Sequence, residues 1–110
     1  METLDTVFKA LSDPTRRAIL ARLAHGEATV DQISEPFEMS QPSISRHLKV
    51  LETAGLISSR VEGTARPRKI EAKPFMAISD WLEQYQTVWE ANFARLDTLL
   101  SELVEKEADH

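Results

Sequence analysis

One short segment carries side chains suited to contacting the edges of DNA bases. Glutamine can pair with adenine, arginine can bind O6 and N7 of guanine, and serine can contact bases or phosphates. Free amides at the start of a helix also favour a phosphate group. The segment offers Gln41, Pro42, Ser43, Ser45, Arg46 and Lys49 as candidate DNA-contacting residues.

The charge of the chain is concentrated around this segment. The net charge is −5, but residues 41–70 carry 6 basic and 2 acidic side chains, while residues 1–40 and 71–110 are both acidic. A basic centre between acidic flanks is typical of a local binding site for a polyanion. A solvated charged face would give the same counts, so charge alone does not decide between the two interpretations.

The candidate residues must lie on a helix for their spacing to matter. Ser40 is a good N-cap and Gly55 a good helix end, which predicts a helix over about 40–54. Ile44, Leu48 and Leu51 recur at helical spacing and form its buried side. The polar residues then share the outward side, as in a DNA-recognition helix.

Three shorter helices are predicted before it, over about 3–11, 14–24 and 29–35. Asp13 caps the second helix, with Pro14 in its first position. Thr29 and Gln32 form a capping box, and Pro36 ends the third helix.

A β-hairpin is predicted over about 56–71. Its strands flank a turn at 62–65, and Pro67 makes the second strand an edge strand. The hairpin serves as a wing, on which Arg60, Arg66 and Arg68 would bind phosphates without regard to sequence. The predicted fold is mainly α with a small β-hairpin wing: a winged helix-turn-helix of about five helices and a two-stranded wing.

The last third of the chain is predicted to be one long helix over about 74–105. Its apolar residues keep helical spacing along its whole length, and the remaining residues are too few to cover them. A partner surface is therefore expected, and a symmetric homodimer is the simplest partner.

Two segments resemble the ArsR/SmtB-type bacterial repressors. These are Phe8-Lys9-Ala10-Leu11-Ser12-Asp13-Pro14-Thr15-Arg16-Arg17-Ala18-Ile19-Leu20 and Met39-Ser40-Gln41-Pro42-Ser43-Ile44-Ser45-Arg46-His47-Leu48-Lys49-Val50-Leu51, followed by Ala54-Gly55-Leu56-Ile57. The resemblance covers about residues 4–100. It implies a homodimer on a palindromic operator, joined by the first and last helices through Leu4, Phe8, Ile78, Trp81, Leu82, Tyr85, Trp89, Phe93 and Leu96.

The role of His47 stays open at this point. It matches a position that members of this family often place near DNA, but the helical pattern also puts it at the border of the buried side. Arg16 and Arg17 are expected to pair with carboxylates such as Asp13, with phosphate contact as the alternative.

The chain departs from the metal sensors of that family. It has no cysteine, its third helix carries no thiol, and its last helix has no histidine before His110. No metal or other cofactor is expected, which resembles the metal-free branch. Trp81, Tyr85 and Trp89 are interpreted as dimer core, although a pocket for an effector of unknown identity is the alternative.

The remaining function classes are disfavoured by what the sequence lacks. It has no Gly-rich phosphate loop and no nucleophile elbow, so no enzyme is expected. Neither a membrane span nor a signal peptide is evident, which predicts a cytoplasmic protein. Residues 1–110 are predicted to form one DNA-binding domain of a transcriptional repressor, possibly an autorepressor. The alternative is a winged helix that binds only proteins, which would present acidic or apolar residues outward.

Overall fold

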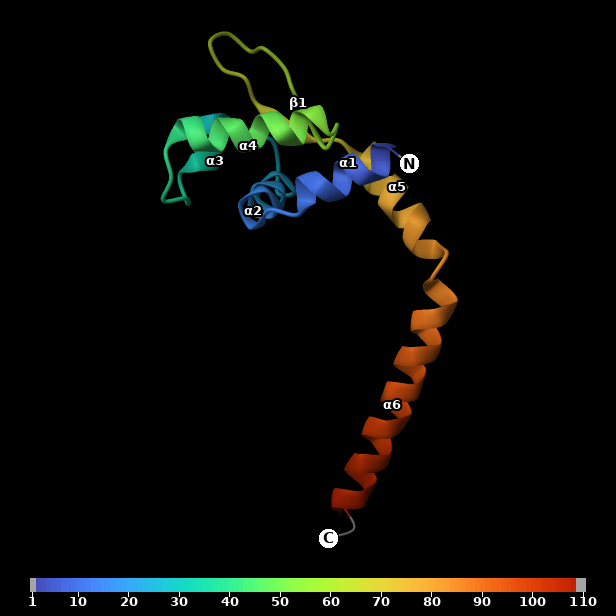
Figure 1. Cartoon of the computed structure of the whole chain (residues 1–110). Coiled ribbons are helices and arrows are strands. Elements are labelled where there is room, and N and C mark those ends of the chain that lie inside the picture. Colours follow the sequence, from blue (N-terminus) through green and yellow to red (C-terminus); the bar gives the residue numbers. More distant parts are fainter. Residues whose placement is uncertain (1, 109–110) are drawn as a thin grey trace. The chain divides into compact units, whose positions relative to one another are not determined.

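The computed structural model describes residues 2–108, so the expectation about His110 lies outside the described residues. Within this range there are six helices and one two-stranded sheet (Figure 1). The chain divides into two compact units, residues 1–78 and residues 79–110. The elements are α1 (Glu2–Leu11), α2 (Pro14–Leu23), α3 (Val30–Ser34), α4 (Gln41–Thr53), β1 (Ile57–Ser59), β2 (Arg68–Ile70), α5 (Ala72–Glu83) and α6 (Gln86–Ala108).

The starts of three helices confirm the predicted caps. The side chains of Asp13, Thr29 and Ser40 each accept a hydrogen bond from a backbone amide three residues further on. The side-chain oxygen of Gln32 accepts a hydrogen bond from the amide of Thr29 at 2.9 Å and completes the capping box. These bonds satisfy amides that have no partner inside their helices, which fixes where α2, α3 and α4 begin.

The core of the first unit lies among α1 to α4 and the base of the hairpin. Its largest fully buried side chains come from each of these elements, and Phe37, in the turn between α3 and α4, packs against them. The fully buried residues are Val7, Ile19, Ile33, Ile44, Leu48, Leu51 and Leu56.

The end of α4 directs the chain into the hairpin. Gly55 has φ of 76°, in the left-handed region where a side chain is disfavoured, and the amide of Leu56 donates to the carbonyl of Leu51 at 3.0 Å. The buried Leu56 belongs to the same core cluster as Leu51 of α4.

The hairpin is shorter than predicted. β1 and β2 are antiparallel, with Ile57 opposite Ile70 and Ser59 opposite Arg68. Pro67 lies just before β2 and accepts a hydrogen bond from the amide of Arg60 at 3.3 Å. Ala28 exchanges two backbone hydrogen bonds with Arg68, at 2.8 and 3.1 Å, and so ties the wing to the segment before α3.

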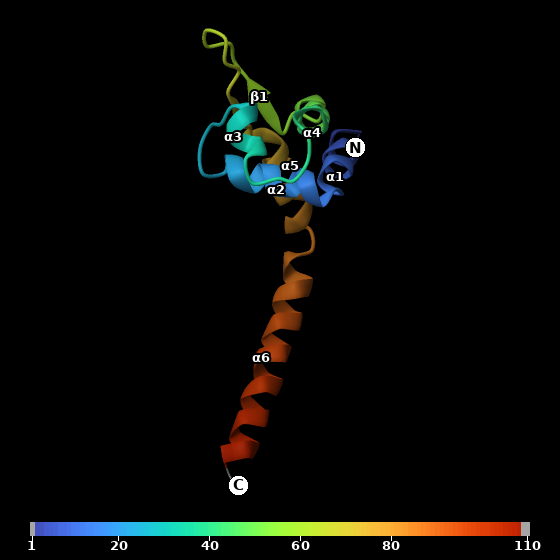
Figure 2. The same cartoon turned by 90° about the vertical axis from the view of Figure 1, so that its left-hand side faces the viewer.

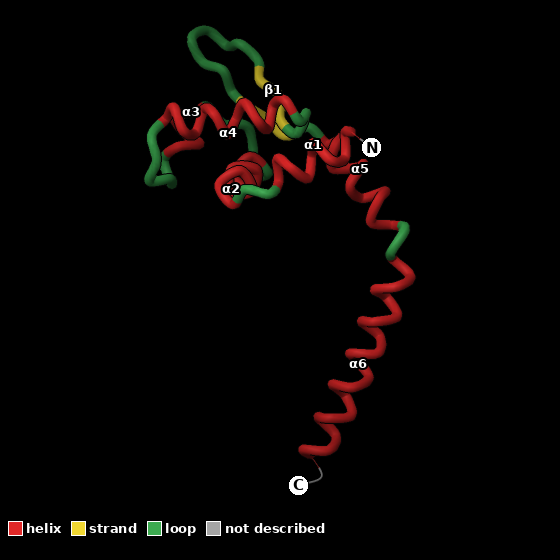
Figure 3. Tube along the Cα trace, viewed as in Figure 1, coloured by secondary structure: helices red, strands yellow, loops and turns green. Residues whose placement is uncertain are grey.

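The prediction of one uninterrupted helix over about 74–105 was wrong, because the helix breaks at Gln84 and Tyr85. The C-terminal segment forms α5 and α6, separated by a short turn (Figure 3). The amides of Gln84 and Tyr85 donate to carbonyls three residues back, at 3.3 and 3.0 Å, which tightens and ends α5. No proline or glycine marks this break, so the apolar spacing continues across it. Among residues 2–108, no helix is both long and apolar enough to span a bilayer.

Candidate nucleic-acid interface

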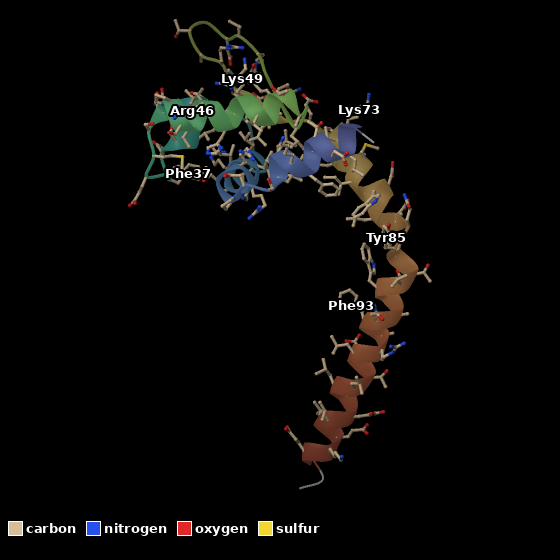
Figure 4. All side chains as sticks on the ribbon, in the orientation of Figure 1. Phe37, Arg46, Lys49, Lys73, Tyr85 and Phe93 are labelled. Atoms are coloured by element: carbon tan, nitrogen blue, oxygen red, sulfur yellow. The ribbon has the colours of Figure 1, made fainter. Side chains whose placement is uncertain are left out.

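The outer side of α4 is polar and cationic. Gln41, Pro42, Ser45, Arg46 and Lys49 are exposed there, and Ser43 is half-buried. Figure 4 shows Arg46 and Lys49 along this helix. The structure thus brings six of the sequence-predicted residues onto a continuous surface, opposite the side that α4 buries in the core.

Arg46 is oriented by a short chain of hydrogen bonds at the start of α4. Its guanidinium donates to the hydroxyl oxygen of Ser43 at 3.2 Å, and the hydroxyl of Ser40 also lies 3.1 Å from that oxygen. The arginine therefore leans toward the helix N-terminus and keeps its other donors free for an acceptor outside the protein.

Gln41 has a partner that the sequence analysis did not identify. Its side-chain amide nitrogen donates a hydrogen bond to the carboxylate of Asp31 on α3. Both side chains are exposed. The contact joins the two helices of the helix-turn-helix at the edge of the α4 surface.

His47 faces the interior contact between α4 and α2. Its Nδ1 lies 3.3 Å from the guanidinium of Arg16 and 3.9 Å from the carboxylate of Asp13. The carboxyl of Asp13 has a lowered pKa, mainly because the amide of Arg16 donates to it, with further support from the nearby His47 and Arg16. The geometry thus separates His47 from the exposed residues of α4.

No close ion pair joins Arg16 or Arg17 to a carboxylate among residues 2–108, although the charge of Arg16 helps to lower the pKa of Asp13. The Arg16 guanidinium donates to the carbonyls of Ala10 at 2.6 Å and Lys9 at 3.3 Å, and Arg17 donates to that of Leu11 at 2.7 Å. These carbonyls end α1 and have no partner within the helix. Both arginines therefore join α1 to α2.

Arg60, the first of the wing arginines, is surrounded by acidic groups. Its guanidinium binds Glu27 and also lies 3.0 Å from Glu62. The hydrogen bond from Arg60 lowers the pKa of Glu27, and the same bond raises the pKa of Arg60. The positive charge of Arg60 is thus largely neutralised by Glu27 and Glu62 within the protein.

The other two wing arginines differ from Arg60 and from each other. Arg68 has a side chain that is only 15% exposed and lies 3.4 Å from Glu52 of α4, so it connects the wing to that helix. Arg66 is exposed and donates to the hydroxyl of Ser59 at 3.3 Å. Among the ion pairs of residues 2–108, Arg66 takes part in none, which leaves its charge available.

A hollow of about 320 Å³ lies between α1 and α4. Its lining includes Lys9, Arg16 and Lys49 but no carboxylate. The wing and α1 lie on opposite sides of α4 (Figure 2). Cationic groups therefore flank α4 on both sides, and Lys9 is a candidate contact that the sequence analysis did not select.

The second unit exposes a long apolar stripe. On α6 the exposed apolar residues Trp89, Phe93, Leu96, Leu100 and Leu103 alternate at four- and three-residue spacing. This is the heptad spacing of helices that pack along one seam. Phe93 is 62% and Leu103 is 58% exposed in the single chain.

The other residues predicted for the dimer interface have varied surroundings. The rings of Trp81 and Tyr85 pack edge to face with centroids 5.3 Å apart. Phe8 is exposed, Leu4 and Leu82 are half-buried, and Ile78 packs against the core of the first unit. Ile78 is therefore at least partly a core residue.

Comparison with known proteins gives consistent matches. Residues 13–59 match the bacterial regulatory protein, arsR family. The HTH-type transcriptional regulator Rv2034 of Mycobacterium tuberculosis is 38% identical over 92 residues, which span 84% of this chain and 86% of that protein. The transcriptional repressor SdpR of Bacillus subtilis is 50% identical over 60 residues, or 54% of this chain and 67% of the repressor.

Solved structures agree with these sequence matches. The crystal structure of an ArsR family transcriptional regulator has a TM-score of 0.74 and 45% identity, and the match covers 81% of this chain and 92% of that one. The homodimeric winged helix-turn-helix DNA-binding domain of a possible ArsR-family regulator from Mycobacterium bovis has a TM-score of 0.64 and 28% identity. That match covers 78% of this chain and 82% of the domain.

Proposed function

The chain belongs to the ArsR family of bacterial transcriptional regulators, and on this premise we propose that it is a homodimeric repressor of a palindromic operator. The observation that carries the proposal is the outer side of α4. There, in the basic segment of an acidic chain, glutamine, serine, arginine and lysine side chains lie together on a capped helix. Such a surface is complementary to the edges and phosphates of the major groove.

In this proposal, the surroundings of each side chain determine whether it contacts bases, contacts phosphates or has a structural role. Gln41, Ser45 and Arg46 contact base edges, since they lie on the outer side of α4 near its N-terminal half. Arg66 binds phosphate from the wing, and Lys49 with Lys9 binds phosphate from the other side of α4. Arg60 and Arg68 have mainly structural roles because each already binds a carboxylate.

Repression requires two copies of the chain. The exposed heptad stripe of α6 packs against its counterpart in the second copy, and α1 contributes through Leu4 and Phe8. Two α4 helices then meet half-sites about one helical turn apart. The bound dimer occludes a promoter in the cytoplasm, and the promoter of its own gene is the first to examine.

Fluorescence anisotropy with the DNA upstream of the protein's own gene tests the proposal. The expected result is saturable binding that survives competitor DNA and weakens steeply as salt is raised. An unrelated duplex of equal length is the control. If the protein bound neither duplex at low salt, nor any duplex from a random library, DNA binding would be excluded and a protein-binding winged helix would replace the proposal.

A further inference from the structure

The contact between Asp31 and Gln41 has a chemical consequence for base recognition. A carboxylate accepts hydrogen bonds and donates none when ionised, so the Gln41 amide must turn its nitrogen toward Asp31. A free glutamine could rotate and present either its nitrogen or its oxygen. Here one N–H of Gln41 is occupied, which leaves the amide oxygen as an acceptor and the second N–H as a donor for an outside group.

We propose that Asp31 is a positioning residue that sets the base preference of Gln41, an inference that rests on the DNA-binding function proposed above. In the major groove, adenine and cytosine each offer an exocyclic amino group, whereas guanine and thymine offer a carbonyl oxygen at the corresponding place. Gln41 with its oxygen turned outward accepts from adenine N6 or cytosine N4. The oxygen beside the remaining N–H of Gln41 matches N6 and N7 of adenine, so the position that Gln41 contacts favours adenine.

The surroundings of Asp31 leave its carboxylate available for this role. The capping box of α3 uses Thr29 and Gln32, and Asp31 takes part in no ion pair among residues 2–108. A simpler role is also open to Asp31, since an acidic residue in the first turn of a helix stabilises its N-terminus. A carboxylate beside DNA phosphates also repels them. Removing the charge of Asp31 should therefore raise the affinity for DNA. Losing its effect on the orientation of Gln41 should instead lower the affinity for the preferred site.

The test compares the full chain with Asp31→Ala, Asp31→Asn, Gln41→Ala and the Asp31→Ala/Gln41→Ala double variant. Binding sites are selected from a random duplex library, and affinity is measured on the selected site and on its three single-base variants at the position that Gln41→Ala affects. Glu38→Ala is the matched control, because Glu38 is another exposed acidic residue of the helix-turn-helix, in the turn before α4. Thermal melting by circular dichroism checks that each variant folds.

The proposal expects a change in preference at a single base position. Asp31→Ala should reduce discrimination there on the order of tenfold while raising affinity for unrelated DNA, and other positions should keep their preference. Asp31→Asn should give an intermediate loss, because its amide can donate or accept. The double variant should discriminate no worse than Gln41→Ala, and Glu38→Ala should raise affinity without altering any preference.

Two results would overturn the inference in distinguishable ways. A uniform change of affinity for all four bases in Asp31→Ala would mean that only the charge or the stability of α3 matters. The repressor proposal would survive that result. Failure of the wild-type chain to select any site would instead remove the proposed function and this inference together.

Discussion

At the scale of single residues, the three arginines of the hairpin have different surroundings and therefore different roles. Arg60, Arg66 and Arg68 lie within nine positions and were predicted to act alike on phosphates. Glu27 and Glu52 bind two of them, while the side chain of Arg66, among the described residues 2–108, donates to the hydroxyl of Ser59 and forms no ion pair. A guanidinium that already binds a carboxylate attracts a phosphate less, so their contributions to DNA affinity should differ.

Arg66→Ala should weaken binding to all DNA sequences alike. Loss of one phosphate contact should lower the slope of log affinity against log salt by about 1. Anisotropy titrations at several salt concentrations measure this slope. Arg60→Ala is the matched control and should change the slope less; equal changes would show that Glu27 does not compete with phosphate.

Arg46→Ala should change base preference as well as affinity. The side chain is exposed and directed by Ser43, so its free donors suit guanine. We expect a cost of about 1–3 kcal/mol on the preferred site and much less on sites altered at one base position. Competition between the operator and its single-base variants measures the difference. An equal loss on every variant would indicate a phosphate contact instead.

At the scale of elements, cross-links between helices and wing hold the α4 surface in place. Arg68 binds Glu52 of α4, and its guanidinium also donates to the backbone of Arg66 at 2.8 Å. Asp13 caps α2 and lies beside His47 of α4. These contacts affect stability first and DNA binding through it.

Arg68→Ala should lower the free energy of unfolding by about 1 kcal/mol, because it removes a partly buried, charge-assisted contact. Urea unfolding followed by circular dichroism measures the loss. Arg66→Ala serves as the control and should leave stability nearly unchanged. If the two variants unfolded at the same urea concentration, Arg68 would have no structural role.

The Asp13 cap should make stability depend on pH in the acidic range. Its pKa in the folded chain is lowered from 3.8, so its stabilising effect is fully present above that value and is lost as pH falls through the lower folded pKa. Asp13→Asn keeps a capping oxygen without the charge. Urea midpoints of both proteins should therefore converge as pH falls below 3.8, and a constant gap would contradict the assignment.

At the scale of the whole molecule, the two units have different relations to solvent. Residues 1–78 enclose a core of their own, whereas α6 exposes apolar residues at heptad spacing along its length. Such a stripe is rarely left in water. A second copy of the chain supplies an identical stripe, so we expect the stripes of two copies to pack together in a symmetric dimer.

Leu96→Asp should therefore dissociate the proposed dimer and weaken operator binding together. Each copy would lose the burial of one leucine and place a charge in the seam, which should weaken dimerisation by more than about a hundredfold. Analytical ultracentrifugation and anisotropy measure the two effects. Ser101→Glu, on the polar side of the same helix, is the control and should remain dimeric. A dimeric Leu96→Asp protein would place the interface elsewhere.

The sequence by itself determined the features that depend on neighbours within one or two helical turns. The caps at Asp13, Thr29 and Ser40, the stop after α3 and the left-handed Gly55 followed from local chemistry, as did the inward side of α4. These features need only the residues a few positions away, so they can be recognised in the linear chain.

Only the tertiary structure decided which side chains meet across larger separations. Arg60 meets Glu27 and Arg68 meets Glu52, so the wing cations differ in a way that no local pattern shows. The Asp31–Gln41 and Arg16–His47 contacts depend on how α3 and α2 pack on α4. The break between α5 and α6 was missed because apolar spacing records which side of a helix is buried. It does not record where the backbone leaves helical geometry when no proline or glycine marks the place.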